Sequence, residues 1–187
     1  MKKKFFGIIC AIFMIGALTG CGANNNSNSD SNSGGNTAKI KGNCHAIECI
    51  KQITVDSTVS DINKIIGFDG ELTDEKYNIY YWEISEDEGI KVAYYGGNKG
   101  TITADFDRDT LANSKVNFSR YSELQPKIKE GISYNDFKSY IGNVDGTITE
   151  KSSISTKYTW VSSDGSYLTA SFSNSSNQCT FASGRVK

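Results

Sequence analysis

The residues of this chain that could do metal or thiol chemistry lie mostly in one short segment. Cys44, His45 and Cys49 form a Cys-His-x-x-x-Cys cluster, and Cys179 follows near the C-terminus. A structural zinc site needs about four ligands, so we predict no metal site here. A disulfide and buried free thiols remain as alternatives. A Cys44–Cys49 bridge would require Cys44 to precede the helix that carries Cys49, because residues five apart in one helix point about 140° away from each other.

Groups suited to catalysis are scarce. The 187 residues include a single His, which argues against a Ser–His catalytic pair. Residues 105–109 (DFDRD) resemble the start of a calcium loop, but the Gly and Glu that an EF-hand requires are missing. The acidic residues of 83–88 are typical of a solvated hairpin turn. We therefore expect no enzyme activity, no cofactor and no small-molecule substrate.

The N-terminus has the pattern of an exported, lipid-anchored protein. Three lysines precede an apolar run over residues 5–18, which is short for a membrane span. Leu18-Thr19-Gly20-Cys21 resembles the bacterial lipobox. We therefore predict a lipoprotein signal peptide over residues 1–20 and acylation (palmitate among the acyl chains) of Cys21. The resulting localisation would be the extracytoplasmic face of the cell membrane.

Charge adds to this prediction. The chain has 20 basic and 21 acidic residues with no basic block, so it does not read as a nucleic-acid binder. Loss of residues 1–20 leaves 17 basic against 21 acidic residues, so the lipid must do the anchoring. Residues 22–42 hold no large apolar side chain before Ile40, so we predict a disordered tether over residues 21–42.

The remainder contains an internal repeat, which predicts units at residues 43–117 and 118–187. Residues 57–67 match 132–142: each has a hydroxyl residue, an Asp three places on and a terminal Gly, the pattern of a capped helix. Asp-Gly turns and Tyr-x-Trp strands follow at offsets of 75–78. Further helices are expected over residues 45–53 and 121–128. The predicted fold is α+β: two tandem helix-helix-antiparallel-sheet units sharing one continuous sheet, with helices on one face.

The aromatic residues suggest which sheet face is buried. Tyr80 and Trp82 recur as Tyr158 and Trp160, so we assign them to the core, with Ile66 and Ile141. Residues that differ between the copies are assigned to the helix-free face, as a surface that binds a partner protein. The alternative is cross-strand packing that only stabilises the sheet. The assigned residues are Tyr81, Ile90, Val92, Tyr94 and Tyr167.

Tandem units of this kind resemble the β-lactamase inhibitory protein family, which is related by fold to small outer-membrane assembly lipoproteins. The likeness lies in Gly131-Ile132-Ser133 through Ile141-Gly142 and in the Tyr-x-Trp strands, and it spans residues 43–187. The resemblance implies a non-enzymatic protein-binding module that could restrain an extracellular enzyme. The alternative is a structural envelope lipoprotein that scaffolds membrane or wall assembly.

Overall fold

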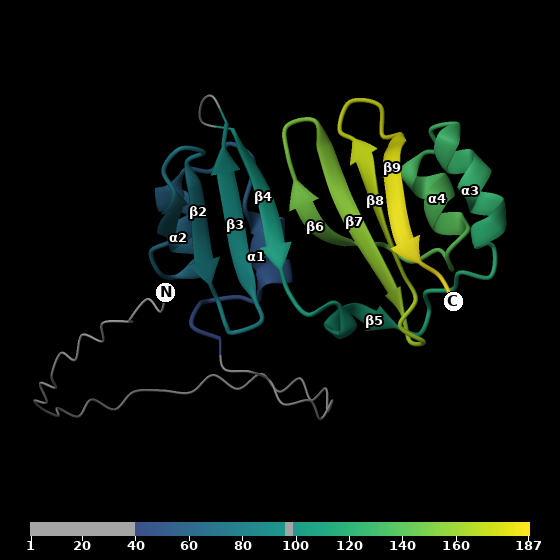
Figure 1. Ribbon diagram of the computed structural model, residues 1–187, viewed down its shortest axis with the longest axis horizontal. Coiled ribbons are helices and arrows are strands. Elements are labelled where there is room, and N and C mark those ends of the chain that lie inside the picture. The colour runs from purple at the N-terminus through teal and green to yellow at the C-terminus, as the bar shows by residue number, and fades with distance from the viewer. Residues whose placement is uncertain (1–39, 96–98) are drawn as a thin grey trace, which may run out of the picture. The chain divides into compact units, whose positions relative to one another are not determined.

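Helices precede strands in each half of the chain, and one sheet joins the two halves (Figure 1). The computed structural model describes residues 40–95 and 99–187. The predicted signal peptide, Cys21 and most of the predicted tether lie outside the described residues. We call residues 40–105 the first half, residues 118–187 the second half, and residues 106–117 the connecting segment.

The first half begins with two helices, α1 (Ala46–Gln52) and α2 (Val59–Ile66). Its strands are β1 (Glu71–Asp74), β2 (Ile79–Glu83), β3 (Gly89–Tyr94) and β4 (Gly100–Asp105). The connecting segment holds the 3-10 helix η1 (Arg108–Leu111) and strand β5 (Ala112–Asn113). The second half has helices α3 (Tyr121–Lys129) and α4 (Tyr134–Ser139) and strands β6 (Thr147–Lys151), β7 (Ser155–Ser162), β8 (Tyr167–Ser173) and β9 (Cys179–Arg185).

Local capping sets where the predicted helices begin and end. The Thr58 hydroxyl accepts from the Asp61 amide, and the Asp61 carboxylate accepts from the Thr58 amide, which completes a capping box. These bonds to Thr58 hold the pKa of Asp61 below its usual value. Ser133 caps α4 in the same way through the Asp136 amide. Gly67 adopts the left-handed conformation (φ 99°) that ends α2, as its position predicts.

The described strands form one nine-stranded sheet in the order β1-β2-β3-β4-β6-β7-β8-β9, with β5 beside β7. Every pairing is antiparallel except that of the two-residue β5, which runs parallel to β7. The halves meet where Ile102 and Thr103 of β4 pair with Lys151 and Glu150 of β6. The α+β class and the continuous sheet are therefore as predicted.

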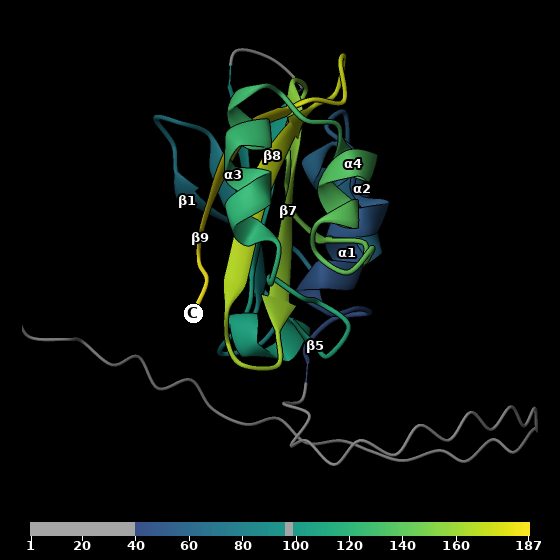
Figure 2. The ribbon, with the colours of Figure 1, turned by 90° about the vertical axis from the view of Figure 1, so that its right-hand side faces the viewer.

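Helices α1, α2 and α4 lie along one face of this sheet and α3 lies beside β9 at its edge (Figure 2). Two apolar cores lie between the helices and the strands. Ile66 and Trp82 belong to the first core, and Ile141 and Trp160 belong to the second; all four are at most 1% exposed, as predicted. Each indole N–H has a partner: Trp82 donates to the Asn63 amide oxygen and Trp160 to the Val144 carbonyl, both at 2.9 Å. Burial of these large rings therefore leaves no indole N–H unsatisfied.

The predicted tether ends earlier than residue 42. Ile40 packs against the first core, and the Lys41 amide donates to the Ile84 carbonyl at 2.8 Å. The Lys41 ammonium also pairs with Glu83 at 2.6 Å. Ile40 is the first large apolar side chain after the Asn/Ser run, and its contact with the core helps to hold residues 40–42 in place.

We expect Trp160→Ala to lower the free energy of unfolding by about 3–5 kcal/mol, because it empties the centre of the second core. Urea denaturation followed by fluorescence of Trp82 measures this loss. Ile154→Ala is the matched control, since Ile154 is 76% exposed and should change stability by less than about 0.5 kcal/mol. A loss below about 1 kcal/mol for Trp160→Ala would contradict the described core.

Candidate functional site

The helix-free face of the sheet carries a row of side chains that crosses both halves. Residues directly opposite one another in antiparallel strands point to the same face. The strand pairings therefore place one residue from every strand between β1 and β9, except β5, in a single row. That row is Glu71, Tyr81, Lys91, Thr103, Glu150, Lys157, Ser171 and Phe181.

Three of the five predicted partner-binding residues lie on the other face. Ile90 pairs with Trp82 and Val92 pairs with Tyr80, so both point toward the helices and are at most 1% exposed. Tyr94 is also buried there, and its hydroxyl donates to the Ser57 carbonyl at 2.8 Å. Burial raises the pKa of Tyr94. The prediction was wrong for these residues because a core position can hold different apolar residues in the two halves.

Tyr81 does lie on the helix-free face, and its ring is held flat. A side chain at Gly89 would overlap the Tyr81 hydroxyl, so the ring occupies the space that a Cβ would fill. Gly89 pairs with Asp105 on the next strand, which brings the phenol toward that carboxylate. Partial burial, with the charges of Asp105 and Glu83, raises the pKa of Tyr81. The Tyr81 ring is therefore half-buried and restricted in its conformation.

Tyr167, the fifth predicted residue, lies at the other end of the same face. It pairs with Val161 of β7 and Arg185 of β9. The Arg108 guanidinium from the connecting segment lies 3.8 Å from the centre of the Tyr167 ring, a cation–π arrangement. The connecting segment is thus fastened to the helix-free face, and Tyr167 is covered on one side.

A cleft of about 560 Å³ opens on this face where the halves meet, and neither tyrosine belongs to its lining. Thr103, Glu150 and Lys157 contribute to its floor, and residues 105–109 form a wall. Lys157 and Glu150 form an ion pair at 2.6 Å, with both side chains about 30% exposed. Thr159 stands between Thr149 and Thr169, with hydroxyl–hydroxyl distances of 3.3 and 3.0 Å. Hydroxyls and charges therefore line the cleft.

Carboxylates outnumber cations in this cleft. Its charged residues are Asp105, Asp107, Asp109 and Glu150 against Arg108 and Lys157. Because Glu150 and Lys157 already pair, the remaining balance is acidic and suits a basic group on a ligand. The sequence analysis did not predict this cleft. The available signal was the alternation of polar residues along the strands, which does not reveal that β4 pairs with β6; we call this junction of the two halves the seam.

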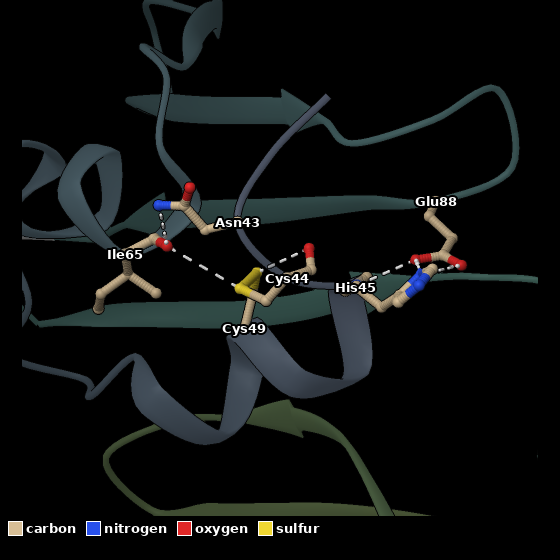
Figure 3. Close-up of a disulfide and its surroundings, with 7 residues drawn as sticks. Asn43, Cys44, His45, Cys49, Ile65 and Glu88 are labelled. Carbon is tan, nitrogen blue, oxygen red and sulfur yellow. Dashed lines mark hydrogen bonds and ion pairs between the residues drawn. A yellow bond between two sulfur atoms is a disulfide. The ribbon is translucent and has the colours of Figure 1, made fainter. Parts of the chain in front are cut away.

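The cysteine–histidine segment forms a structural crosslink (Figure 3). Cys44 and Cys49 are disulfide-bonded, and α1 begins at Ala46, so Cys44 lies before the helix as the bridge requires. Both sulfurs are consumed, which removes them as thiolate metal ligands. Cys179 is a buried free thiol, and burial raises its pKa.

Glu88 has a defined role beside this bridge, where the sequence predicted a solvated acidic turn. Its carboxylate accepts from the Ala46 amide at 3.1 Å and lies 3.1 Å from His45 Nδ1 (Figure 3). A carboxylate at the amino end of a helix is favoured by the exposed amides and the helix dipole. His45, the single histidine of the chain, is the N-cap residue of α1 and is not part of the cleft lining.

Comparison with known proteins adds no relative. No protein-family model matches the chain, and no curated protein or solved structure matches it. The resemblance to the β-lactamase inhibitory protein family therefore stays a prediction. None of the described helices has the length and apolar character needed to cross a membrane.

We expect reduction of the Cys44–Cys49 bridge to lower the free energy of unfolding by about 2 kcal/mol, since the bridge closes a very short loop. Urea denaturation with and without a reductant measures the difference. Cys179→Ala should respond to reductant as the parent chain does, whereas Cys44→Ala/Cys49→Ala should not respond. Equal stability of the oxidised and reduced parent chains would overturn the structural role.

Proposed function

We propose that the chain is a lipid-anchored, extracytoplasmic protein-binding module with no catalytic activity. In this proposal Cys21 carries the lipid, and the helix-free face of the sheet holds a partner protein. An extracellular enzyme that the module restrains is the kind of partner implied by the family resemblance. The observation that carries the proposal is the acidic cleft where β4 and β6 meet, on the sheet face that also holds Tyr81 and Tyr167.

Two features of the helix-free face support protein recognition. Tyr81 and Tyr167 offer aromatic area whose conformation is already restricted, by Gly89 and by Arg108 respectively. Fixed aromatic residues lose little conformational entropy on binding, and tyrosines are frequent at the centres of protein interfaces. The acidic balance of the wall residues adds electrostatic complementarity to a Lys or Arg side chain on a partner's loop.

We also propose that residues 43–117 and 118–187 are two copies of one unit. In support, Tyr80 and Trp82 of β2 pair with residues of β3 in the way that Tyr158 and Trp160 of β7 pair with residues of β8. The glycines of the two Asp-Gly turns lie against the indole rings of their own half, where a Cβ would collide. The strand pairings relate Val92 to Ala170 and Ile102 to Ala182. The offset is therefore 80 in the last strand, larger than the sequence alignment predicted.

The anchor is tested with full-length protein in intact cells that are fed a labelled fatty acid. The parent chain should carry label and fractionate with membranes, whereas Cys21→Ser should lose the label and leave the membrane fraction. Cys179→Ser is the matched control, because its thiol is buried and should not affect labelling. Unchanged labelling of Cys21→Ser would exclude acylation at this site.

The binding face is tested with a photo-crosslinking residue placed in the full chain in cells. A crosslinker at Thr103, in the cleft, should capture a specific protein, and one at exposed Lys64 on α2 should not. Asp105→Lys and Tyr81→Ala should each reduce capture at least tenfold, because an interface tyrosine contributes about 2 kcal/mol or more. Capture that is equal at both positions, or unaffected by these substitutions, would contradict the proposal.

A further inference from the structure

The outer edge of the sheet in the second half borders an open groove. β9 is the last strand of the sheet, and α3 lies beside it (Figure 2). The groove between them has a volume of about 1070 Å³, and its lining includes Tyr121, Pro126, Ile128 and Ala182. Among the strands that the structure describes, none pairs with this edge. Gln125, Lys129 and Glu130 also line the groove, so it offers both apolar and charged contacts. An unpaired strand beside such a groove can accept another strand.

In the first half the corresponding strand is β4, and its outer edge is occupied by β6. The Gly100 amide at the start of β4 donates to the Val55 carbonyl at 2.8 Å, and β6 pairs with β4 from Ile102 onward. At the start of β9, the Cys179 amide likewise donates to the Ile132 carbonyl at 2.8 Å. The edge that follows Cys179 therefore corresponds to the edge that β6 occupies. The seam between the halves supplies the geometry of an added strand.

Two side chains show what the added strand contributes at the seam. Ile148 of β6 packs against the first core, although it belongs to the second half. Lys151 of β6 donates to the carbonyls of Lys51 and Ile53 at the end of α1, at 3.2 and 3.1 Å. An apolar side chain and a terminal charged group thus seat β6 against α1.

β1 at the opposite edge of the sheet has the matching pattern. Leu72 pairs with Tyr80 as Ile148 pairs with Tyr158, so Leu72 is the counterpart of Ile148, and it is 41% exposed. Asp74 corresponds in the same way to Glu150, and Glu75 follows it as Lys151 follows Glu150. Within the described part of the chain, an exposed apolar strand residue and a groove without an occupant therefore lie at the two edges of the sheet.

Charge complementarity favours this pairing between copies. Glu75 would stand where Lys151 stands at the seam, beside the end of the neighbouring helix. In α3 that end carries Lys129, while Lys127 of the same turn already pairs with Glu130 at 2.9 Å. Glu75 on the strand and Lys129 on the helix have opposite charges, which steers and stabilises association.

We propose that β1 of one copy adds to β9 of the next, so that copies of this chain associate head to tail. The register of the seam predicts Ala182 opposite Glu75 and Ser183 opposite Asp74 of the neighbour. Leu72 then enters the groove against Ile128. This interface uses the edges of the sheet and is independent of the helix-free face proposed to bind a partner protein.

Cysteine crosslinking of the full chain in intact cells tests the proposal. Asp74→Cys and Ser183→Cys should each give no dimer when expressed alone and a disulfide-linked dimer when coexpressed under mild oxidation. A chain that carries both substitutions should give a ladder of oligomers, because each copy then presents both partners. The unsubstituted chain controls for its native cysteines, and Glu75→Cys with Ser183→Cys is the register control, since adjacent strand residues point to opposite faces.

The outcomes decide between arrangements. Dimers from Ser183→Cys alone would indicate β9 paired with β9 and would overturn the head-to-tail proposal, as would the absence of crosslinks in every combination. Equal crosslinking through Glu75→Cys and Asp74→Cys would indicate random collision and would also overturn it. Lys129→Glu should reduce the coexpressed dimer several-fold, and Glu75→Lys in the other chain should restore it.

Discussion

The rest of the structure depends on how the two halves are joined, and the Lys151 ammonium group contributes to that junction. Lys151 lies on β6 in the second half, and its ammonium group donates to two carbonyls at the end of α1 in the first half, about one hundred residues away in sequence. Partial burial lowers its pKa, so the donated bonds must offset a real desolvation cost. Hydrogen bonds to a charged group contribute about 1.5–3 kcal/mol each, which matters because a unit of roughly 70 residues is marginally stable alone.

The cleft is a consequence of that seam. β4 and β6 are neighbours in the sheet, yet the connecting segment and the helices α3 and α4 separate them in sequence. The chain therefore leaves β4, runs beside the end of β7 through β5, and reaches β6 only after α3 and α4. The connecting segment does this on the helix-free side: β5 pairs with Val161 and Ser162, and Arg108 lies over Tyr167. Its residues become the wall of the cleft and the two halves become its floor. The proposed binding surface therefore requires both halves to be joined in this register.

Local features could be predicted from the sequence, and features that depend on register could not. Thr58 and Asp61 cap the start of α2, and Gly67 ends it. Each acts on the helix turn next to it, so the local sequence pattern is enough to predict where α2 begins and ends. The repetition of Trp82 and Trp160 identified the core because a large ring without cover is costly in both halves. The face of Val92 was assigned wrongly because its counterpart is Ala170, and both positions are buried although the two residues differ. Glu88 and Lys151 find partners far away in sequence, which no local pattern reveals.

The described sheet has two open edges, at β1 and β9, and the charges on these strands and their neighbours determine which edges can pair. β1 carries Glu71 and Asp74 on a four-residue strand, a length and charge that discourage its pairing with another β1. Glu75, which follows Asp74, has the opposite charge to Lys129 beside β9 and so favours the head-to-tail pairing. Because the edges lie at right angles to the helix-free face, every copy in such a row would keep its cleft open. A row of anchored modules could then engage a multivalent partner through several clefts at once, raising avidity without any new contact within the cleft.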